Sequence, residues 1–276
     1  MHLSFWGTRG SIAVPGSDTL RYGGNTTCLE VNFGGGHCLI VDSGTGIRRL
    51  GEKLASRPEP PRVKMILTHL HFDHLYGFPF FSPVYQAEAE IKVGGWPTGL
   101  EGLASLFDSR QNDGRFPLRF DQLPSKIGRS AQMTASRFEL GAAVVRTTPL
   151  HHPQGCLGLR FEEGGNAIVF ITDNELDPNA EIKPAALVPF CQGAEVLIHD
   201  AQYLPEEMPS RAGWGHSDWR SAVELARMSG VGRLILTHHE PSRTDDQIDE
   251  IVAKARYAAG ANMMVEAAYE GMKVEV

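Results

Sequence analysis

Short apolar runs bounded by polar turns recur along all 276 residues of this chain. Runs of about four to eight residues are typical of buried strands. The predicted strands cover residues 2–6, 28–33, 37–41, 63–67 and 90–93, and then 143–148, 156–161, 167–172, 195–199, 233–237, 263–266 and 272–276. The glycines at 34–36 predict a hairpin turn between the second and third of these strands.

Four stretches show the apolar spacing or the end signals of helices. One begins after residues 42–46, one lies within 75–81, and two cover 217–228 and 245–259. Ser217 is the expected N-cap of the third, because its hydroxyl can accept a hydrogen bond from a free N–H of the first turn.

Each half of the chain therefore gives strands followed by helices, and no linker is long enough to divide two domains. Such a pattern favours an α/β fold in which two sheets pack face to face with helices outside, a four-layer αββα sandwich. We predict one domain over residues 1–276, with a variable excursion at about 96–138. Its basic residues belong either to a solvated surface loop or to a lid that meets an anionic substrate. They are Arg110, Arg115, Arg119, Lys126, Arg129 and Arg137.

The formal net charge of −7 gives no general attraction for nucleic acid or anionic membranes. The four cysteines are scattered without a C-x-x-C spacing, which is typical of reduced thiols in the cytoplasm. The first residues do not show the pattern of a signal peptide, and no apolar run approaches membrane-spanning length. We therefore expect a cytoplasmic protein without a membrane partner.

The strongest chemical signal follows the predicted strand at 63–67. His69 and His71 are two residues apart, so an extended chain directs both side chains to one face. Asp73 and His74 come next, where the strand gives way to a turn. Imidazoles and carboxylates are preferred ligands of borderline divalent metals. Four such donors in six residues predict two adjacent metal sites.

This stretch resembles the His-x-His-x-Asp-His signature of the metallo-β-lactamase fold superfamily at every specified position. The resemblance implies the αββα sandwich and a binuclear metal centre. It assigns His69 and His71 to the first metal, and Asp73 and His74 to the second.

Further ligand candidates stand where later apolar runs end. The spacing does not decide between His151 and His152, but a His-Pro-x-Gly pattern of the family favours His152. The resemblance makes Asp173 a carboxylate that bridges both metals, although an aspartate in a turn is the alternative. The family's Leu-Thr-His motif favours His238 as the last ligand of the second metal, with the adjacent His239 as the alternative.

The cofactor implied is a pair of divalent cations, with Zn²⁺ favoured and Mn²⁺ or Fe²⁺ also compatible with ligands that lack thiolates. Asp42 resembles the family's carboxylate that holds a ligand histidine by its second ring nitrogen, and it could also cap the following helix. Asn25, Thr26 and Arg9 are expected to line the same cavity or to support it.

Residues outside the ligand set point to one branch of the superfamily. The segment around His216 and Ser217 resembles the His-Ser-Thr motif of a phosphodiesterase-like branch, which includes tRNase Z-type nucleases and phosphoribosyl cyclic phosphodiesterases. There the histidine stabilises the transition state and protonates the departing oxygen. Asp200 stands where that branch has a glutamate that orients the histidine. The resemblance thus names Asp73, His216 and Asp200 as catalytic, whereas capping and strand-end roles are the alternatives for the last two.

We therefore expect a hydrolase that cleaves a small cyclic or linear phosphodiester through a metal-bridging hydroxide. The alternatives are a thioester or lactam hydrolase of the same fold and a metal-binding regulatory protein without turnover. The partner expected is a small molecule. Nucleic acid is less favoured, since the sequence shows no long basic arm, and a homodimer is compatible with the resemblance.

Overall fold

The computed structural model describes residues 1–107, 116–177 and 182–276. Arg110 and Arg115 of the predicted excursion lie outside the described residues.

The first sheet has seven strands and is mixed. Its order is β14 (Lys273–Glu275), β1 (His2–Gly7), β2 (Cys28–Asn32), β3 (Cys38–Val41), β4 (Arg62–Leu67), β5 (Glu90–Gly95) and β6 (Lys126–Arg129). The strands β14 to β3 pair antiparallel, whereas β3 to β6 pair parallel. The predicted pairing of β2 with β3 is confirmed.

The second sheet also has seven strands and mirrors this arrangement. Its order is β13 (Met264–Ala267), β12 (Arg233–Thr237), β11 (Val196–Asp200), β10 (Asn166–Ile171), β9 (Cys156–Glu163), β8 (Ala143–Leu150) and β7 (Arg137–Leu140). The strands β10 to β13 are parallel, so their carboxyl ends lie at one edge of the sheet.

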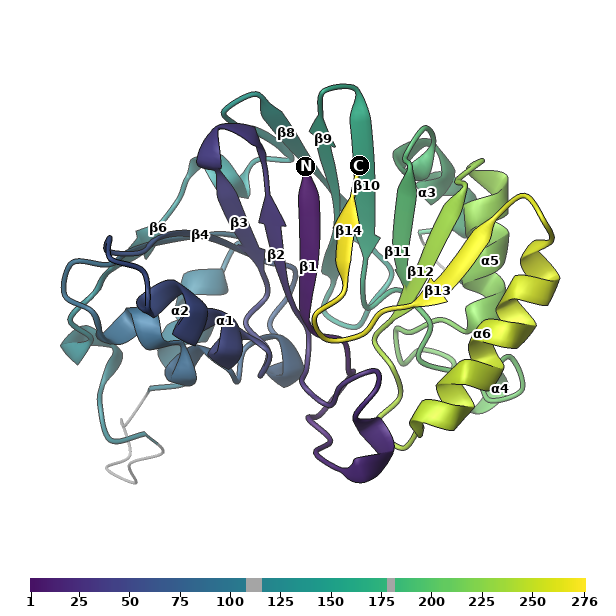
Figure 1. Cartoon of the computed structure of the whole chain (residues 1–276), viewed down its shortest axis with the longest axis horizontal. Coiled ribbons are helices and arrows are strands. Elements are labelled where there is room, and N and C mark those ends of the chain that lie inside the picture. Colours follow the sequence, from purple (N-terminus) through teal and green to yellow (C-terminus); the bar gives the residue numbers. More distant parts are fainter. Residues whose placement is uncertain (108–115, 178–181) are drawn as a thin grey trace.

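Helices cover the outer face of each sheet (Figure 1). The helices α1 (Ile47–Ala55) and α2 (Gly99–Ser105) lie on the first sheet, and α5 (Trp219–Met228) and α6 (Asp245–Ala259) lie on the second. Two shorter helices, α3 (Pro184–Cys191) and α4 (Met208–Arg211), belong to the second half.

The two sheets share a central apolar core. Phe5 and Val31 of the first sheet pack in one cluster with Phe161 and Ile198 of the second. The neighbouring Leu197 faces the other way, into the cluster beneath α5, as alternation along a strand requires. Both faces of the central strands are therefore buried, and the predicted αββα sandwich is confirmed.

Two local predictions differ from the structure. The short helix predicted within 75–81 is the 3₁₀ helix Phe78–Phe80, which lies between the 3₁₀ turns Phe72–His74 and Ser82–Tyr85. It does not extend into an α-helix, because Pro79 and Pro83 lack the N–H that a longer helix needs. The N-cap of α5 is Asp218, whose carboxylate accepts from the N–H groups of Arg220 and Ser221. Helix α3 was missed, since its two prolines hide the helical signal.

The hydroxyl of Ser217, the expected cap, serves a different contact. It donates to the carbonyl of Asn174 at 2.6 Å and accepts from the N–H of Leu176 at 3.1 Å. Ser217 therefore joins the start of α5 to the segment that follows β10.

The predicted excursion at 96–138 contains α2 and β6, so its described part is more ordered than its sequence pattern indicates. Its described basic residues each have an acidic neighbour, and none lines the cavity beside the motif of His69 to His74. The pairs are Arg119–Asp121, Lys126–Glu88, Arg129–Glu101 and Arg137–Glu139. These contacts favour the surface interpretation of the excursion over a lid.

Among the described helices, none combines the length and the apolar character needed to cross a membrane. The candidate functional residues lie at the ends of strands. Asp173 follows β10, Asp200 ends β11 and His238 follows β12, while β4 leads into His69. The N–H of Leu157 donates to the carbonyl of Thr68 at 3.1 Å and thereby ties the second sheet to the end of β4.

Removal of a ring from the shared core should strongly lower stability. Phe161 is fully buried between the sheets, with its ring 6.2 Å from that of Phe33. We expect Phe161→Ala to lower the free energy of unfolding by about 3–5 kcal/mol, because it removes apolar contacts and leaves a cavity. Chemical denaturation followed by tryptophan fluorescence would measure this. Tyr257→Ala, at a position that is 93% exposed, should change it by less than about 0.5 kcal/mol, and equal losses in both variants would contradict the assignment of the core.

Candidate metal centre

The first group of donors joins both sheets at one point. His69, His71, His152 and Asp173 each offer one atom, and these atoms lie within 4.8 Å of one another. Nε2 of His69 is 3.5 Å and Nε2 of His152 is 3.7 Å from Oδ2 of Asp173. Nδ1 of His71 is 2.9 Å from Nε2 of His152. Four donors from three separate chain segments therefore surround a single position.

The second group uses the other oxygen of the same aspartate. Oδ1 of Asp173 lies 3.2 Å from Nε2 of His74 and 3.3 Å from Nε2 of His238. Oδ2 of Asp73 lies 3.4 Å and 3.2 Å from the same two nitrogens. Asp173 thus contributes one oxygen to each group, which is the arrangement that a shared carboxylate requires.

The donor set fits a pair of cations. Nε2 of His69 and Nε2 of His74 are buried without a hydrogen-bond partner. A buried polar nitrogen without a partner is rare and costly, so both atoms indicate a missing ligand. Burial lowers the pKa of His69 well below its ordinary value and that of His152 to about 4, which keeps both imidazoles in the neutral form that binds metal.

The ring nitrogen of a ligand histidine that points away from the donor group makes a hydrogen bond of its own. Nδ1 of His74 donates to Oδ2 of Asp42 at 2.8 Å, and Asp42 also accepts from the N–H and hydroxyl of Thr68. Such contacts fix which nitrogen faces the metal. Asp42 therefore lies where the resemblance implies, and its carboxylate does not cap α1, whose N-cap is Gly46 without a side-chain bond.

Three further contacts of this kind were missed by sequence reasoning. Gln154 Oε1 accepts from Nε2 of His71 at 2.9 Å, and Gln202 Oε1 accepts from Nδ1 of His238 at 2.9 Å. The carbonyl of Gly215 accepts from Nδ1 of His152 at 2.8 Å. Their partners are 36 to 83 residues away in sequence, so no local pattern indicates them.

A second constellation lies beside the donors. Nδ1 of His216 donates to Oδ2 of Asp200 at 2.7 Å, and Oδ1 of Asp200 accepts from the N–H of Gln202 at 2.9 Å. Burial alone would lower the pKa of His216, but the Asp200 carboxylate outweighs it and raises that pKa to about 9. The ring of His216 stacks on that of His238 at 4.8 Å. The aspartate therefore reaches the histidine although it is one methylene shorter than glutamate.

A cavity of about 380 Å³ opens onto both features. It is lined by Ser11, Leu70, His71, Phe72, Asp73, Asp173 and His216. Donor atoms of both groups and the His216 ring thus face one space that a small molecule can enter.

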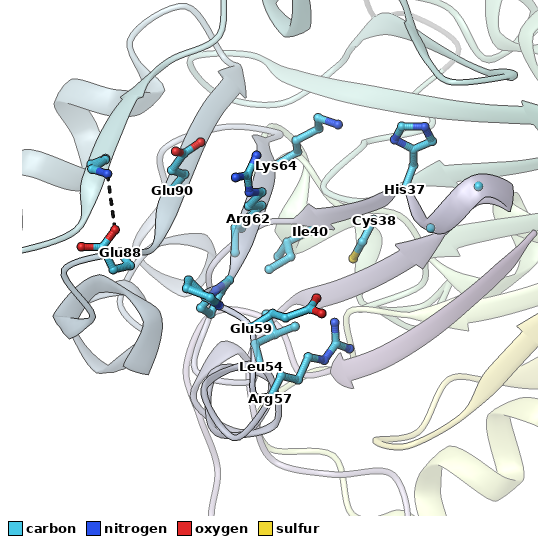
Figure 2. Close-up of a pocket in the computed structure, with 16 residues that line it drawn as sticks. His37, Cys38, Ile40, Leu54, Arg57, Glu59, Arg62, Lys64, Glu88 and Glu90 are labelled. Carbon is cyan, nitrogen blue, oxygen red and sulfur yellow. Dashed lines mark ion pairs between the residues drawn. The ribbon is translucent and has the colours of Figure 1, made fainter.

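A larger cavity of about 810 Å³ lies at the amino-terminal end of β4 (Figure 2). Its walls carry charges of both signs, among them Arg57, Arg62, Lys64, Glu59 and Glu90. No member of the two donor groups lines it. Because β4 runs from this cavity toward His69, the larger cavity is at the opposite end of the strand from the metal centre.

The comparisons with known proteins agree with this geometry. The family described as "Beta-lactamase superfamily domain" matches residues 37–239. The chain belongs to this superfamily. The match includes every residue of both donor groups and the His216–Asp200 pair, and the predicted resemblance is confirmed.

Relatives of this superfamily member include ribonuclease Z of Bradyrhizobium sp. strain ORS 278. It is 26% identical over 303 aligned positions, which cover 92% of this chain and 93% of the relative.

Solved structures show the same fold along the whole chain. The metallo-β-lactamase fold protein YhfI of Bacillus subtilis has a TM-score of 0.71 and 18% identity, with 99% of this chain and 98% of that one covered. The short form of human tRNase Z has a TM-score of 0.68 and 21% identity, with 100% and 99% covered. A diphosphatase from the PhnP family has a TM-score of 0.66 and 18% identity, with 100% and 97% covered.

In this β-lactamase-superfamily chain, the contacts show which histidine of each adjacent pair belongs to a donor group. His152 belongs to the first donor group and His151 to none. His238 belongs to the second, whereas Nε2 of His239 donates to the carbonyl of Ala268, and burial lowers the pKa of His239 to about 3. The structure thus places His152 and His238, the two histidines that the family patterns favour, in the donor groups.

Arg9 does not face the cavity, contrary to one of the two roles expected for it. It is fully buried, and its guanidinium donates to the backbone carbonyls of Gly23, Glu240 and Arg243. The side chain therefore ties together loops from opposite ends of the chain. These carbonyls satisfy the N–H donors of a buried cation, which would otherwise be costly to take out of water.

Asn25 and Thr26 likewise line no wall of the cavity. The amide of Asn25 donates to both carboxylate oxygens of Glu270, and the hydroxyl of Thr26 accepts from the N–H of Thr45. Both fix the loop ahead of β2. Ser11, which sequence reasoning passed over, is the loop residue that reaches the centre, since its N–H donates to Oδ2 of Asp73 at 2.8 Å.

The neighbouring histidines 151 and 152 provide a matched test of the donor groups. We expect His152→Ala to reduce bound divalent metal from about two equivalents per chain to about one, because the first group loses a ligand. His151→Ala should keep the wild-type content. Elemental analysis after dialysis against a weak chelator would measure both. Equal metal contents in the two variants would contradict the first donor group.

Proposed function

We propose that this protein is a binuclear metal-dependent hydrolase of phosphoric diesters. The observation that carries the proposal is the His216–Asp200 pair, buried beside two groups of metal donors and open to the same cavity. A fold by itself does not define a reaction, so this pair, rather than the superfamily, supports the choice.

One metal would be held by His69, His71, His152 and Asp173, and the other by Asp73, His74, Asp173 and His238. Zn²⁺ suits these nitrogen and oxygen ligands, and Mn²⁺ and Fe²⁺ are also compatible. Two such cations supply positive charge that makes water more acidic and offsets the charge of the phosphate oxygens.

The protein's own groups act on the leaving side of the reaction. Hydrolysis forms one bond from a water oxygen to phosphorus and breaks the bond from phosphorus to the departing oxygen, which needs a proton. Because Nδ1 of His216 donates to Asp200, the proton for the departing oxygen comes from Nε2. The Asp200 carboxylate stabilises the protonated ring and fixes its orientation.

A small substrate is the proposed choice. The cavity volume of about 380 Å³ suits a small molecule, and neither lysine nor arginine is among the described residues that line it. A ribonuclease activity is the second candidate, because relatives such as that of Bradyrhizobium are named ribonuclease Z. We also propose that residues 1–276 form one catalytic domain, since strands from both ends of the chain share the central core.

Loss of the proposed proton donor should slow turnover without loss of metal. We expect His216→Ala to lower kcat for a diester with an alkoxide leaving group, such as thymidylyl-(3′→5′)-thymidine, by about 10²-fold or more, the usual contribution of a general acid. The effect on bis(p-nitrophenyl) phosphate should be smaller, because p-nitrophenolate departs without a proton. Metal content should remain that of the wild type. An unchanged kcat would refute the role of His216. Turnover of a thioester or of nitrocefin by the wild type, but not of the diester, would favour the alternative hydrolases.

Asp200 is proposed as a positioning residue, so its substitution should affect kcat more than KM. Asp200→Asn is expected to lower kcat at least about tenfold, because a neutral amide no longer stabilises the protonated ring. Asp200→Glu, which restores the acid found in the related branch, should recover part of the loss. Steady-state kinetics would measure the separate effects on kcat and KM. If Asp200→Asn and Asp200→Glu lose activity equally, packing and not charge explains the effect.

A further inference from the structure

Two aromatic rings form an exposed stack at the edge of the metal centre. Phe72 stands between the donors His71 and Asp73, and it is 64% exposed. Its ring lies 4.5 Å from that of Tyr76 at an angle of 17°. Tyr76 is itself 47% exposed. The pair therefore presents an apolar surface to solvent next to a buried polar site.

The stack also belongs to the cavity. Phe72 is one of its lining residues, together with Asp73, Asp173 and His216. Tyr76 covers one face of the Phe72 ring and holds it in place. A ring that is already ordered loses little conformational freedom when a second ring stacks against it.

We propose that Phe72 and Tyr76 form a platform for the base of a nucleoside phosphodiester whose phosphate lies at the metal centre. This inference rests on the proposed function and names its substrate class. Aromatic side chains bind bases through their π-faces, and this contact is open to every base. The platform would therefore select substrates with a base next to the scissile phosphate without selecting a particular base.

The charge of the cavity supports stacking over a grip on a long polyanion. Proteins that hold single strands combine stacked rings with a groove of lysine and arginine. Within the part of the chain that the structure describes, the residues lining this cavity include two acids, Asp73 and Asp173, and no lysine or arginine. Binding energy away from the metals must therefore come mainly from the apolar wall of Phe72 and Leu70. A nucleotide-sized diester fits this balance better than a long nucleic acid.

The test compares two diesters that share p-nitrophenol as leaving group, namely thymidine 5′-(p-nitrophenyl phosphate) and ethyl p-nitrophenyl phosphate. The readout is the ratio of their kcat/KM values on the metal-loaded protein. We expect the wild type to prefer the nucleoside ester by about tenfold or more, the usual effect of one stacked base. Phe72→Ala should bring this ratio close to one. Phe72→Trp should keep it, whereas Phe72→Leu should not.

Two controls separate stacking from damage to the site. Tyr76→Ala lies outside the ligand motif and should lower the ratio several-fold with wild-type metal content. Tyr257→Ala removes an exposed ring on α6 that does not line the cavity, and it should leave the ratio unchanged. A wild-type ratio near one, or a ratio that survives Phe72→Ala, would overturn the platform.

Failure of the proposed function would give a different result. If the wild type cleaves neither ester, calorimetry with thymidine 5′-monophosphate and with inorganic phosphate tests the platform directly. The platform then predicts that the nucleotide binds at least about tenfold more tightly than phosphate and that Phe72→Ala removes the difference. Equal affinities would refute the platform independently of catalysis.

Discussion

The carboxylate of Asp173 is the contact on which the centre depends. One oxygen faces His69 and His152, and the other faces His74 and His238. The histidines come from segments of both sheets, so this one side chain contacts residues of both at their shared edge. One oxygen of Asp173 also lies within 4.8 Å of an oxygen of Asp73, a second buried acid. Two carboxylates so close repel each other when both are ionised, and a pair of cations would offset this repulsion.

The same constraint explains the backbone around the donors. Asp42, Asp173 and His238 all have positive φ values, of 60°, 46° and 58°. Each follows a strand directly or within two residues, and the left-handed conformation turns the side chain back toward the centre. This conformation costs on the order of 1 kcal/mol for a residue other than glycine, although aspartate and histidine tolerate it better than most. Buried contacts such as that of Asp42 with Thr68 maintain it.

The sequence predicts this architecture well wherever the signal is local. Apolar runs located most strands, and the compact motif of His69 to His74 located four of the seven donor residues. The sequence did not predict contacts between residues that are far apart along the chain. No local pattern indicates that Gln202 contacts His238. The polar loop around Arg9 was expected to line or support the cavity, because the sequence does not show that Arg9 binds residues such as Glu240, 231 positions away. Helix α3 was hidden by prolines that suit its first turn but not its interior.

The position of Phe72 follows from the ligand motif itself. The turn Phe72–His74 is a 3₁₀ turn, in which successive side chains diverge by roughly 120°. Asp73 and His74 must both face the centre, so the residue ahead of them is directed outward, where it cannot bind metal. Such a position is free of the constraint on its neighbours yet remains beside the reacting atoms. Residues there can change what the centre accepts without a change in the centre, and here the position holds a large aromatic ring.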